Sequence, residues 1–287
     1  MRSDAIREHA REPAPVLIRG LLPRAEPHAA AELVQRLGLW ERAGAAPPRP
    51  LVLLNMVSTV DGRATVDGHS GAISSPADRD LFHALRAAVD AVLVGAGTVR
   101  TERYGRIITD PARRALRVQR GLSPEPLACI VSASLALDSD IPLLAERESR
   151  VVFLTPSQGE LAPVGAQVQY VRREADGRLD LGAALAELAT RFGIGMLLCE
   201  GGPHLAGDLL AAGLLDELFL TVSPALVGTI SGPGRELRVV AGAELSPPVE
   251  LELLDVLEHG SHLFLHYRVA GSERVSRETI PSSSLAR

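Results

Sequence analysis

From Leu51 onward, short and almost wholly apolar runs alternate with stretches of helical pattern, and this alternation constrains the fold more than any other feature. A strand that is apolar along its whole length is covered on both faces, which is typical of a parallel sheet between layers of helices. The runs that we interpret as strands are residues 51–57, 91–95, 127–131, 151–154, 168–171, 196–199 and 218–222. The sequence therefore predicts an α/β fold with a mostly parallel central sheet and helices on both faces.

Helix starts and a terminal hairpin support this interpretation. Ser75 precedes a proline, a pattern typical of a helix N-terminus, and Asp180 precedes a second amphipathic stretch. A third helix is expected over residues 204–212. Residues 251–257 and 263–269 flank a short polar connection, and they predict an antiparallel hairpin at the C-terminal edge of the sheet.

The two ends of the chain differ from its middle. Residues 27–39 have a helical pattern, and a proline-rich stretch at 45–50 follows them. We interpret residues 1–50 as an appended segment with a linker, residues 51–271 as the catalytic domain, and the polar residues 272–287 as a loose tail.

Composition excludes several classes of function. The formal net charge of −5 is spread along the chain, which argues against binding to nucleic acid or to an anionic membrane and favours a small-molecule partner. The sequence contains no lysine, which rules out Schiff-base catalysis and a P-loop lysine. Cys129 and Cys199 lie in apolar runs and predict buried thiols in a cytoplasmic protein, with no metal site.

A glycine-rich turn follows the strand expected at residues 91–95. Gly95, Gly97, Thr98 and Val99 lead from this strand into a helix, and the free N–H groups of such a turn suit a phosphate. The third glycine of the usual dinucleotide fingerprint is absent, since Arg100 takes its place. A tight structural turn explains this segment equally well when it is taken alone.

A second turn repeats the pattern after residues 196–199. It begins with a carboxylate, continues with two glycines and enters a helix at a proline; its residues are Glu200, Gly201, Gly202, Pro203, His204 and Leu205. Two such turns on one sheet together predict a dinucleotide, because its phosphates need separate anion sites. The carboxylate of Glu200 at the end of an apolar strand is a candidate to bind N–H groups of a substrate, although a solvated loop acid is the alternative.

The loop after the first strand is rich in small polar residues, at 55–63 and again at 67–75. Such a loop suits the wall of a site for a polar ring and a nicotinamide carboxamide. By itself it is equally compatible with a flexible surface loop.

Residues 55–62, 75–86, 90–102 and 200–228 resemble the reductase domain of riboflavin biosynthesis, which shares its fold with dihydrofolate reductase. The resemblance runs through residues 50–270. It implies NADPH as the hydride donor, a homodimer, and a substrate such as 5-amino-6-(5-phosphoribosylamino)uracil, whose opened ribose is reduced as an imine to ribitylamine.

The resemblance also implies site residues. Those expected to contact the nicotinamide and its ribose are Val57, Ser58 and Ala72. Phosphate contacts are expected at Thr98 and at residues 201–205, and a further cofactor contact at Glu102. The substrate side falls on Ser70, Arg86 and Glu200, with Arg86 offering a guanidinium fork to the ribosyl phosphate. Asp61, Glu102 and Glu200 all remain candidates for the proton donor.

This chain departs from the family's pattern in two places. It has no H-x-E or P-C-x-x-C element, so the zinc deaminase that many organisms fuse to this reductase is not expected and the chain is expected to be monofunctional. After Glu102 it reads Arg103-Tyr104-Gly105, where the bifunctional enzymes carry Asn or Asp, then Pro. This loop leaves the substrate open, so a pterin such as dihydrofolate is an alternative. A non-catalytic nucleotide-binding protein is a third.

Overall fold

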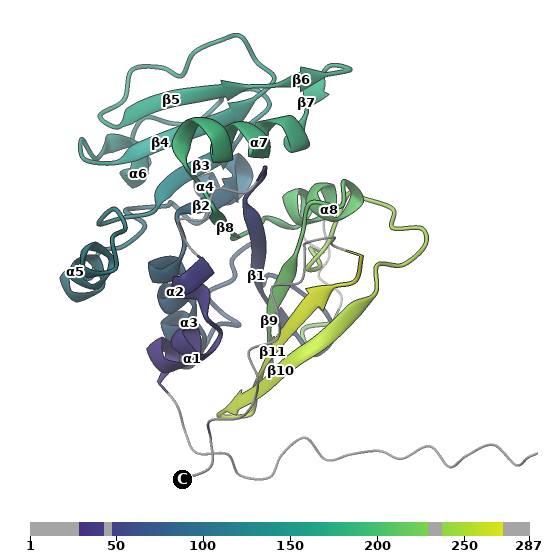
Figure 1. The fold of residues 1–287 in the computed structure, drawn as a ribbon. Coiled ribbons are helices and arrows are strands. Elements are labelled where there is room, and N and C mark those ends of the chain that lie inside the picture. The colour runs from purple at the N-terminus through teal and green to yellow at the C-terminus, as the bar shows by residue number, and fades with distance from the viewer. Residues whose placement is uncertain (1–28, 43–47, 229–236, 272–287) are drawn as a thin grey trace, which may run out of the picture.

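Nine strands form one sheet at the centre of the computed structural model, which describes residues 29–42, 48–228 and 237–271. The strand order is β10-β11-β9-β1-β8-β2-β3-β4-β5. The strands of this sheet are β1 Leu51–Thr59, β2 Ala91–Gly95, β3 Leu127–Val131, β4 Arg150–Thr155, β5 Gln167–Arg172, β8 Met196–Cys199, β9 Glu217–Ser223, β10 Leu251–His259 and β11 His262–Val269. All the apolar runs that the sequence predicts as strands are strands in the structure (Figure 1).

Eight helices are described, and two short strands form a separate hairpin. The helices are α1 Ala30–Arg36, α2 Leu39–Arg42, α3 Pro76–Ala88, α4 Ala96–Thr101, α5 Pro111–Gln119, α6 Pro142–Ala145, α7 Leu181–Phe192 and α8 Pro203–Ala211. The small hairpin joins β6 Glu174–Ala175 and β7 Arg178–Leu179. Among these described helices, none is long and apolar enough to cross a membrane.

The predicted fold class is confirmed. Strands β9, β1, β8, β2, β3, β4 and β5 run parallel to their neighbours, and β11 and β10 close one edge as an antiparallel hairpin. The hairpin turn is tighter than the sequence predicts, since His259 pairs with His262. Gly260 and Ser261 both have a positive φ, which is the turn geometry that matches the twist of paired strands.

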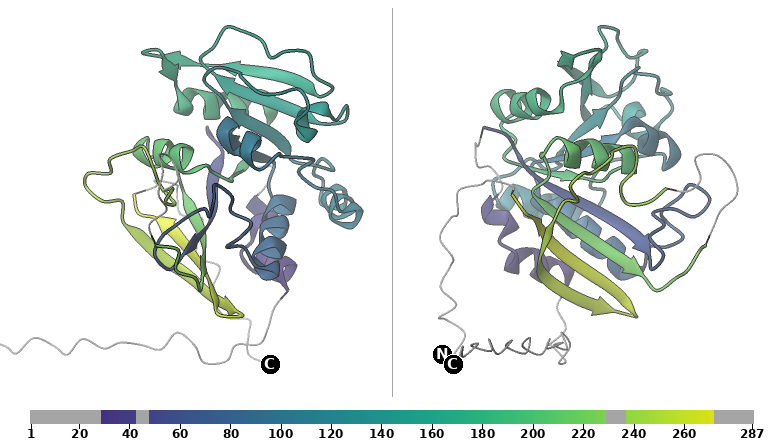
Figure 2. Two further views of the ribbon diagram at one scale, coloured as in Figure 1. Left: turned by 180° about the vertical axis from the view of Figure 1, so that it is seen from behind. Right: turned by 90° about the vertical axis from the view of Figure 1, so that its right-hand side faces the viewer.

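Helices cover both faces of the sheet (Figure 2). Successive residues of β1 alternate between the two cores: Leu51 and Leu53 pack toward α1, α2 and α3, whereas Val52 and Leu54 pack toward α7 and α8. Two predicted caps are confirmed as well. The Ser75 side chain accepts a hydrogen bond from the N–H of Asp78 at 3.1 Å, and that of Asp180 accepts one from Ala183 at 2.9 Å.

The segment before β1 packs against the same core. The side chains of Val34 and Leu39 are 1% and 0% exposed within the cluster that includes α3. The predicted helix over 27–39 is shorter in the structure, because Gly38 with φ +63° ends it; residues 27 and 28 lie outside the described part. Residues 45–47 of the expected linker and all of the expected tail, 272–287, also lie outside the described part.

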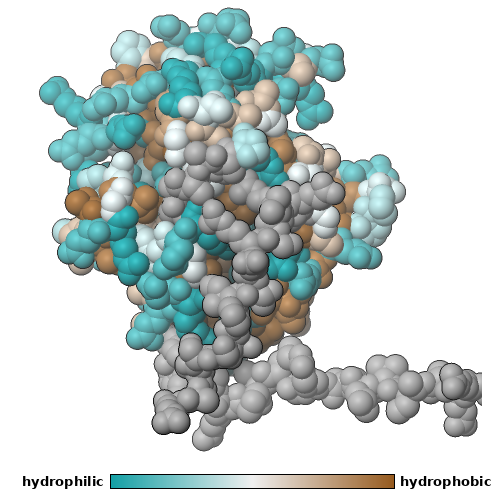
Figure 3. Space-filling view, viewed as in Figure 1, coloured by the Kyte–Doolittle hydropathy of each residue, from teal (hydrophilic) through white to brown (hydrophobic). Residues whose placement is uncertain are grey.

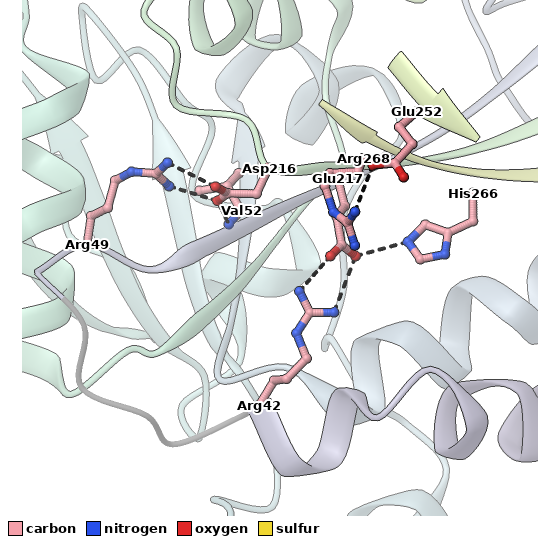
Figure 4. A network of polar contacts seen from close by, with 8 residues as sticks. All are labelled: Arg42, Arg49, Val52, Asp216, Glu217, Glu252, His266 and Arg268. Carbon is pink, nitrogen blue, oxygen red and sulfur yellow. Dashed lines mark hydrogen bonds and ion pairs between the residues drawn. The ribbon is translucent and has the colours of Figure 1, made fainter. Parts of the chain in front are cut away.

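Two buried carboxylates tie this segment to the sheet: Glu217, the first residue of β9, and Asp216, which precedes it (Figure 4). Arg42 of α2 donates to Glu217, with 2.7 Å between Nη2 and Oε1. Arg49 donates to both carboxylate oxygens of Asp216 at 2.8 and 2.9 Å. These ion pairs hold Arg42 and Arg49 beside the start of β9.

Candidate active site

The two glycine-rich turns lie side by side at the carboxyl ends of neighbouring strands β2 and β8. The N–H of Gly95 donates to the carbonyl of Gly201 at 2.8 Å, so a hydrogen bond links the turns directly. A Cβ on Gly202 would stand 2.8 Å from Oγ1 of Thr98, whereas a Cβ on Gly97 would meet nothing within 4 Å. Glycine is therefore needed at Gly202 for close packing, and Gly97 faces open space. The Gly201–Gly202 peptide bond is cis.

A cavity of about 490 Å³ opens beside these turns, at the carboxyl ends of β1, β2 and β8. Its size is typical of a small-molecule site, and its position is where ligands bind in open α/β sheets. Eleven of the residues that the sequence singles out line it: Val57, Ser70, Gly95, Gly97, Thr98, Glu102, Glu200, Gly202, Pro203, His204 and Leu205. Turns and loop that are separate in the sequence thus share one cavity.

Other expected site residues lie behind the wall of the cavity or away from it. Ser58 is buried in β1, and Val99 has no exposed surface and packs in the core. Gly201 is buried under Met56, whose Sδ would stand 3.0 Å from a Cβ there. Ala72 is exposed. The cofactor contacts expected of these four residues stay predictions.

Thirteen further residues line the cavity that the sequence analysis did not single out individually, although several lie in the loop segments 55–63 and 67–75 that it expected to form a wall: Asn55, Met56, Ala64, Thr65, Gly68, Gly71, Ser74, Asp78, Arg79, Phe82, Thr101, Tyr104 and Leu237. Asn55 carried a usable signal, because it is the one polar residue within the apolar run 51–57. Tyr104 carried none, since its loop departs from the family's pattern and only folding brings it to Glu200.

Glu200 is the best-connected group of the site. Its carboxylate accepts from Arg86, with Nε to Oε1 at 2.6 Å and Nη2 to Oε2 at 2.7 Å, and the hydroxyl of Tyr104 donates to Oε2 at 2.6 Å. The Glu200 side chain is 2% exposed, and the Arg86 guanidinium also lies 4.1 Å from the centre of the Phe82 ring. Burial lowers the pKa of Arg86, but the charge and hydrogen bonds of Glu200 outweigh it and raise that pKa above its usual value.

These contacts change what the sequence led us to expect of both residues. The remaining terminal nitrogen of Arg86 donates to the carbonyl of Ile107 at 3.1 Å, so its fork is engaged within the chain. A ribosyl phosphate would have to displace one of these partners, which weighs against the expected phosphate contact. Glu200 is neither a solvated loop acid nor free to offer both oxygens to a substrate, because its buried carboxylate already has three donors.

Glu102 also lines the cavity. The backbone N–H and the hydroxyl of Ser70 both donate to Oε1 of Glu102, at 3.0 and 3.1 Å. Nδ1 of His69 lies 3.5 Å from the other oxygen, Oε2. This cluster fixes the loop of residues 67–71 against α4 and its following turn.

Asp61, the third candidate acid, has a structural environment. Its carboxylate accepts from the hydroxyl of Thr59 at 2.5 Å and from the backbone N–H of Gly228 at 2.7 Å. The hydrogen bond from the Thr59 hydroxyl, the larger effect, and that from the Gly228 N–H hold the pKa of the Asp61 carboxyl below its usual range. A group that is ionised at neutral pH and lies outside the set that lines the cavity is a poor proton donor.

The chain is similar to known proteins over most of its length. Residues 50–264 match the model of the RibD C-terminal domain. A 2,5-diamino-6-ribosylamino-4(3H)-pyrimidinone 5′-phosphate reductase of Methanothermobacter thermautotrophicus is 29% identical over 233 residues, which is 78% of this chain and all of that protein. A riboflavin biosynthesis protein RibD of Mycobacterium tuberculosis is 30% identical over 82% of this chain, but the match covers only 62% of its own length.

The fold has solved relatives. The crystal structure of a pyrimidine reductase-like protein from Corynebacterium diphtheriae superposes with a TM-score of 0.65 at 24% identity, covering 84% of this chain and 99% of that one. At this identity the likeness concerns the fold. The family match, which spans the sheet and both glycine-rich turns, decides the assignment: the chain belongs to the RibD C-terminal domain family of reductases, a family that uses a nicotinamide cofactor.

Proposed function

We propose that this chain is an NADPH-dependent reductase of a ribosylaminopyrimidine 5′-phosphate in riboflavin biosynthesis. The observation that carries the proposal is the pair of hydrogen-bonded glycine-rich turns that face one cavity with Glu200 in its wall. Two rings fit the family: the uracil that the sequence resemblance implies, and the 2-amino-4-pyrimidinone in the name of the archaeal relative.

The residues around the two turns fit a dinucleotide. Open space at Gly97 and the close approach of Gly202 to Thr98 leave backbone N–H groups of α4 and α8 available to phosphate oxygens. Thr98, with its hydroxyl beside Gly202, would serve both turns. The adjoining loop, with Val57 and Ser70 in the cavity wall, would hold the nicotinamide end.

When bound, NADPH would supply a hydride to the carbon of the substrate's C=N bond, and the nitrogen would take a proton. The chain's part is to align the two rings, exclude water and supply that proton. Of the three candidate acids, Glu102 fits this last role best, because it lines the cavity and contacts the neutral Ser70 and the imidazole of His69. Glu200 is committed to Arg86, and Asp61 to backbone N–H groups.

We further propose that the protein acts as a cytoplasmic homodimer. Strand β10 is an edge strand that leaves Leu251 and Leu253 42% and 43% exposed, and Leu263 of β11 is 37% exposed. Figure 3 shows hydrophobic residues on the side of the molecule where Figure 1 draws this hairpin. A bare apolar edge favours pairing with a second copy. Leu253→Asp should then yield a monomer by light scattering, and a wild-type monomer would contradict the proposal.

The function is tested with the purified full chain and a substrate panel followed at the nicotinamide absorbance. Oxidation of NADPH is expected with one or both pyrimidines, at a rate far above that with dihydrofolate, and slower with NADH. Gly97→Val should fill the open space and abolish binding of NADPH measured by calorimetry. Gly182→Val, which makes the same change at the start of α7, serves as the control and should bind NADPH normally. Failure to bind either pyrimidine overturns the proposal, and faster turnover of dihydrofolate favours the pterin alternative.

A further inference from the structure

Tyr104 lies beside the buried carboxylate of Glu200 in the wall of the cavity. Its hydroxyl oxygen is 2.6 Å from Oε2 of Glu200, and Tyr104 itself lines the cavity. We propose that Tyr104 is a substrate-binding residue: Glu200 holds its proton, and the phenol oxygen accepts a hydrogen bond from an N–H of the pyrimidine ring. The inference rests on the proposed function and names the group that recognises the ring.

The backbone fixes the position of Tyr104. Its N–H donates to the carbonyl of Val99 at 3.2 Å, and its carbonyl accepts from the N–H of Leu143 at 2.8 Å. The preceding Arg103 has φ +48°, a conformation that a non-glycine residue adopts only when its surroundings impose it. Arg103 is itself held by a donor contact to the carbonyl of Asp140 at 3.1 Å. The ring is therefore placed beside Glu200 before any ligand arrives.

The available protons decide the direction of the hydrogen bond between Tyr104 and Glu200. A carboxylate paired with a guanidinium is an acceptor only, and Arg86 donates to both oxygens of Glu200. Tyr104 has one proton and donates it to Glu200, so toward any further partner its oxygen can only accept. The Arg86 guanidinium beside it takes part of this capacity, which leaves one lone pair for the cavity. Burial and the neighbouring charge of Glu200 raise the pKa of Tyr104 well above its usual value, so the phenol stays protonated.

The chemistry of the expected ligand follows from this polarity. Because the Tyr104 oxygen offers only lone pairs, it accepts hydrogen bonds from N–H and amino groups and repels a ring carbonyl. The Tyr104 oxygen is also a stronger acceptor than a free phenol, because its own hydrogen bond to a carboxylate polarises it. Tyr104 therefore selects the orientation in which a pyrimidine turns an N–H edge, and not an oxo group, toward Glu200. Arg86 and Glu200 act through Tyr104 and are positioning residues.

Tyr104→Phe tests the contact, because it removes the oxygen and leaves the ring and the Arg86–Glu200 pair in place. We expect kcat/KM for the pyrimidine to fall at least tenfold, mainly through KM, with the Kd for NADPH changed less than twofold. Tyr267→Phe makes the same change in β11, where Tyr267 packs against the core and is not among the residues that line the cavity, and should leave both values unchanged.

Ring methylation provides a readout that a merely structural role would not move. Wild-type protein should lose at least tenfold in affinity for the pyrimidine analogue that is N-methylated at the contacting nitrogen, whereas Tyr104→Phe should lose much less on the same methylation. Equal losses in both proteins at every ring nitrogen would overturn the inference. The inference would also be overturned if no N-methylated analogue bound wild-type protein more weakly than the parent pyrimidine does. Wild-type protein that binds neither parent pyrimidine would overturn the proposed function and this inference together, whereas normal turnover by both proteins overturns the role of Tyr104 alone.

Discussion

A single methyl group at Gly202 should push the two glycine-rich turns apart. The backbone there has φ −70° and ψ −174°, which alanine adopts without strain, so the cost of Gly202→Ala comes only from what its Cβ meets. That atom would stand 2.8 Å from Oγ1 of Thr98, closer than a carbon and an oxygen normally approach. Overpacking of this kind costs about 1–3 kcal/mol, with the lower figure if Thr98 rotates away.

Unfolding of the cofactor-free protein in urea measures this cost, and a second substitution isolates its cause. In a Thr98→Ala background the obstructing oxygen is gone, so adding Gly202→Ala should cost less than about 0.5 kcal/mol. Gly201→Ala is the matched control: its φ of +82° strains any L-residue and its Cβ meets Met56, so Thr98→Ala should not rescue it. Equal costs for Gly202→Ala with and without Thr98 would refute the reasoning.

Two buried carboxylates give the remaining predictions. Burial raises the pKa of Glu217, but hydrogen bonds from His266 and Arg42 outweigh this effect and lower the pKa from 4.5 to about 2. The ionised group therefore adds about 3 kcal/mol to the free energy of unfolding. This contribution is complete above pH 4.5 and is lost as the pH falls toward 2. Glu217→Gln should lower the free energy of unfolding at pH 7 and flatten its decline between pH 4.5 and 2 in urea titrations; an unchanged decline would contradict this. Arg86→Ala leaves Glu200 buried without its counter-charge and should cost about 3–5 kcal/mol, with the double variant Arg86→Ala, Glu200→Ala costing less than the sum of the two single changes. A loss below 1 kcal/mol for Arg86→Ala in guanidinium unfolding would show that the pair contributes little.

Much of the sheet was readable from the sequence, because the signals that specify it are local. A run such as 91–95 is apolar at every position, and this is the requirement for a strand covered on both faces. Caps act over three residues, as at Ser75 and Asp180, so they too were visible. Less periodic segments were missed: α5 has only Arg117 as a buried residue, and no apolar stripe announces it.

The site divides in the same way. Two glycine-rich turns that each follow a buried strand and enter a helix together indicate a phosphate-binding edge, so the sequence by itself determined the fold class, the two turns and the expectation of a dinucleotide. Only the tertiary structure decided what Glu200 does, because its partners Arg86 and Tyr104 are 114 and 96 positions away in the chain. Burial makes those partners obligatory: a carboxylate taken out of water must find donors, and which donors it finds depends on how the strands and loops are packed together.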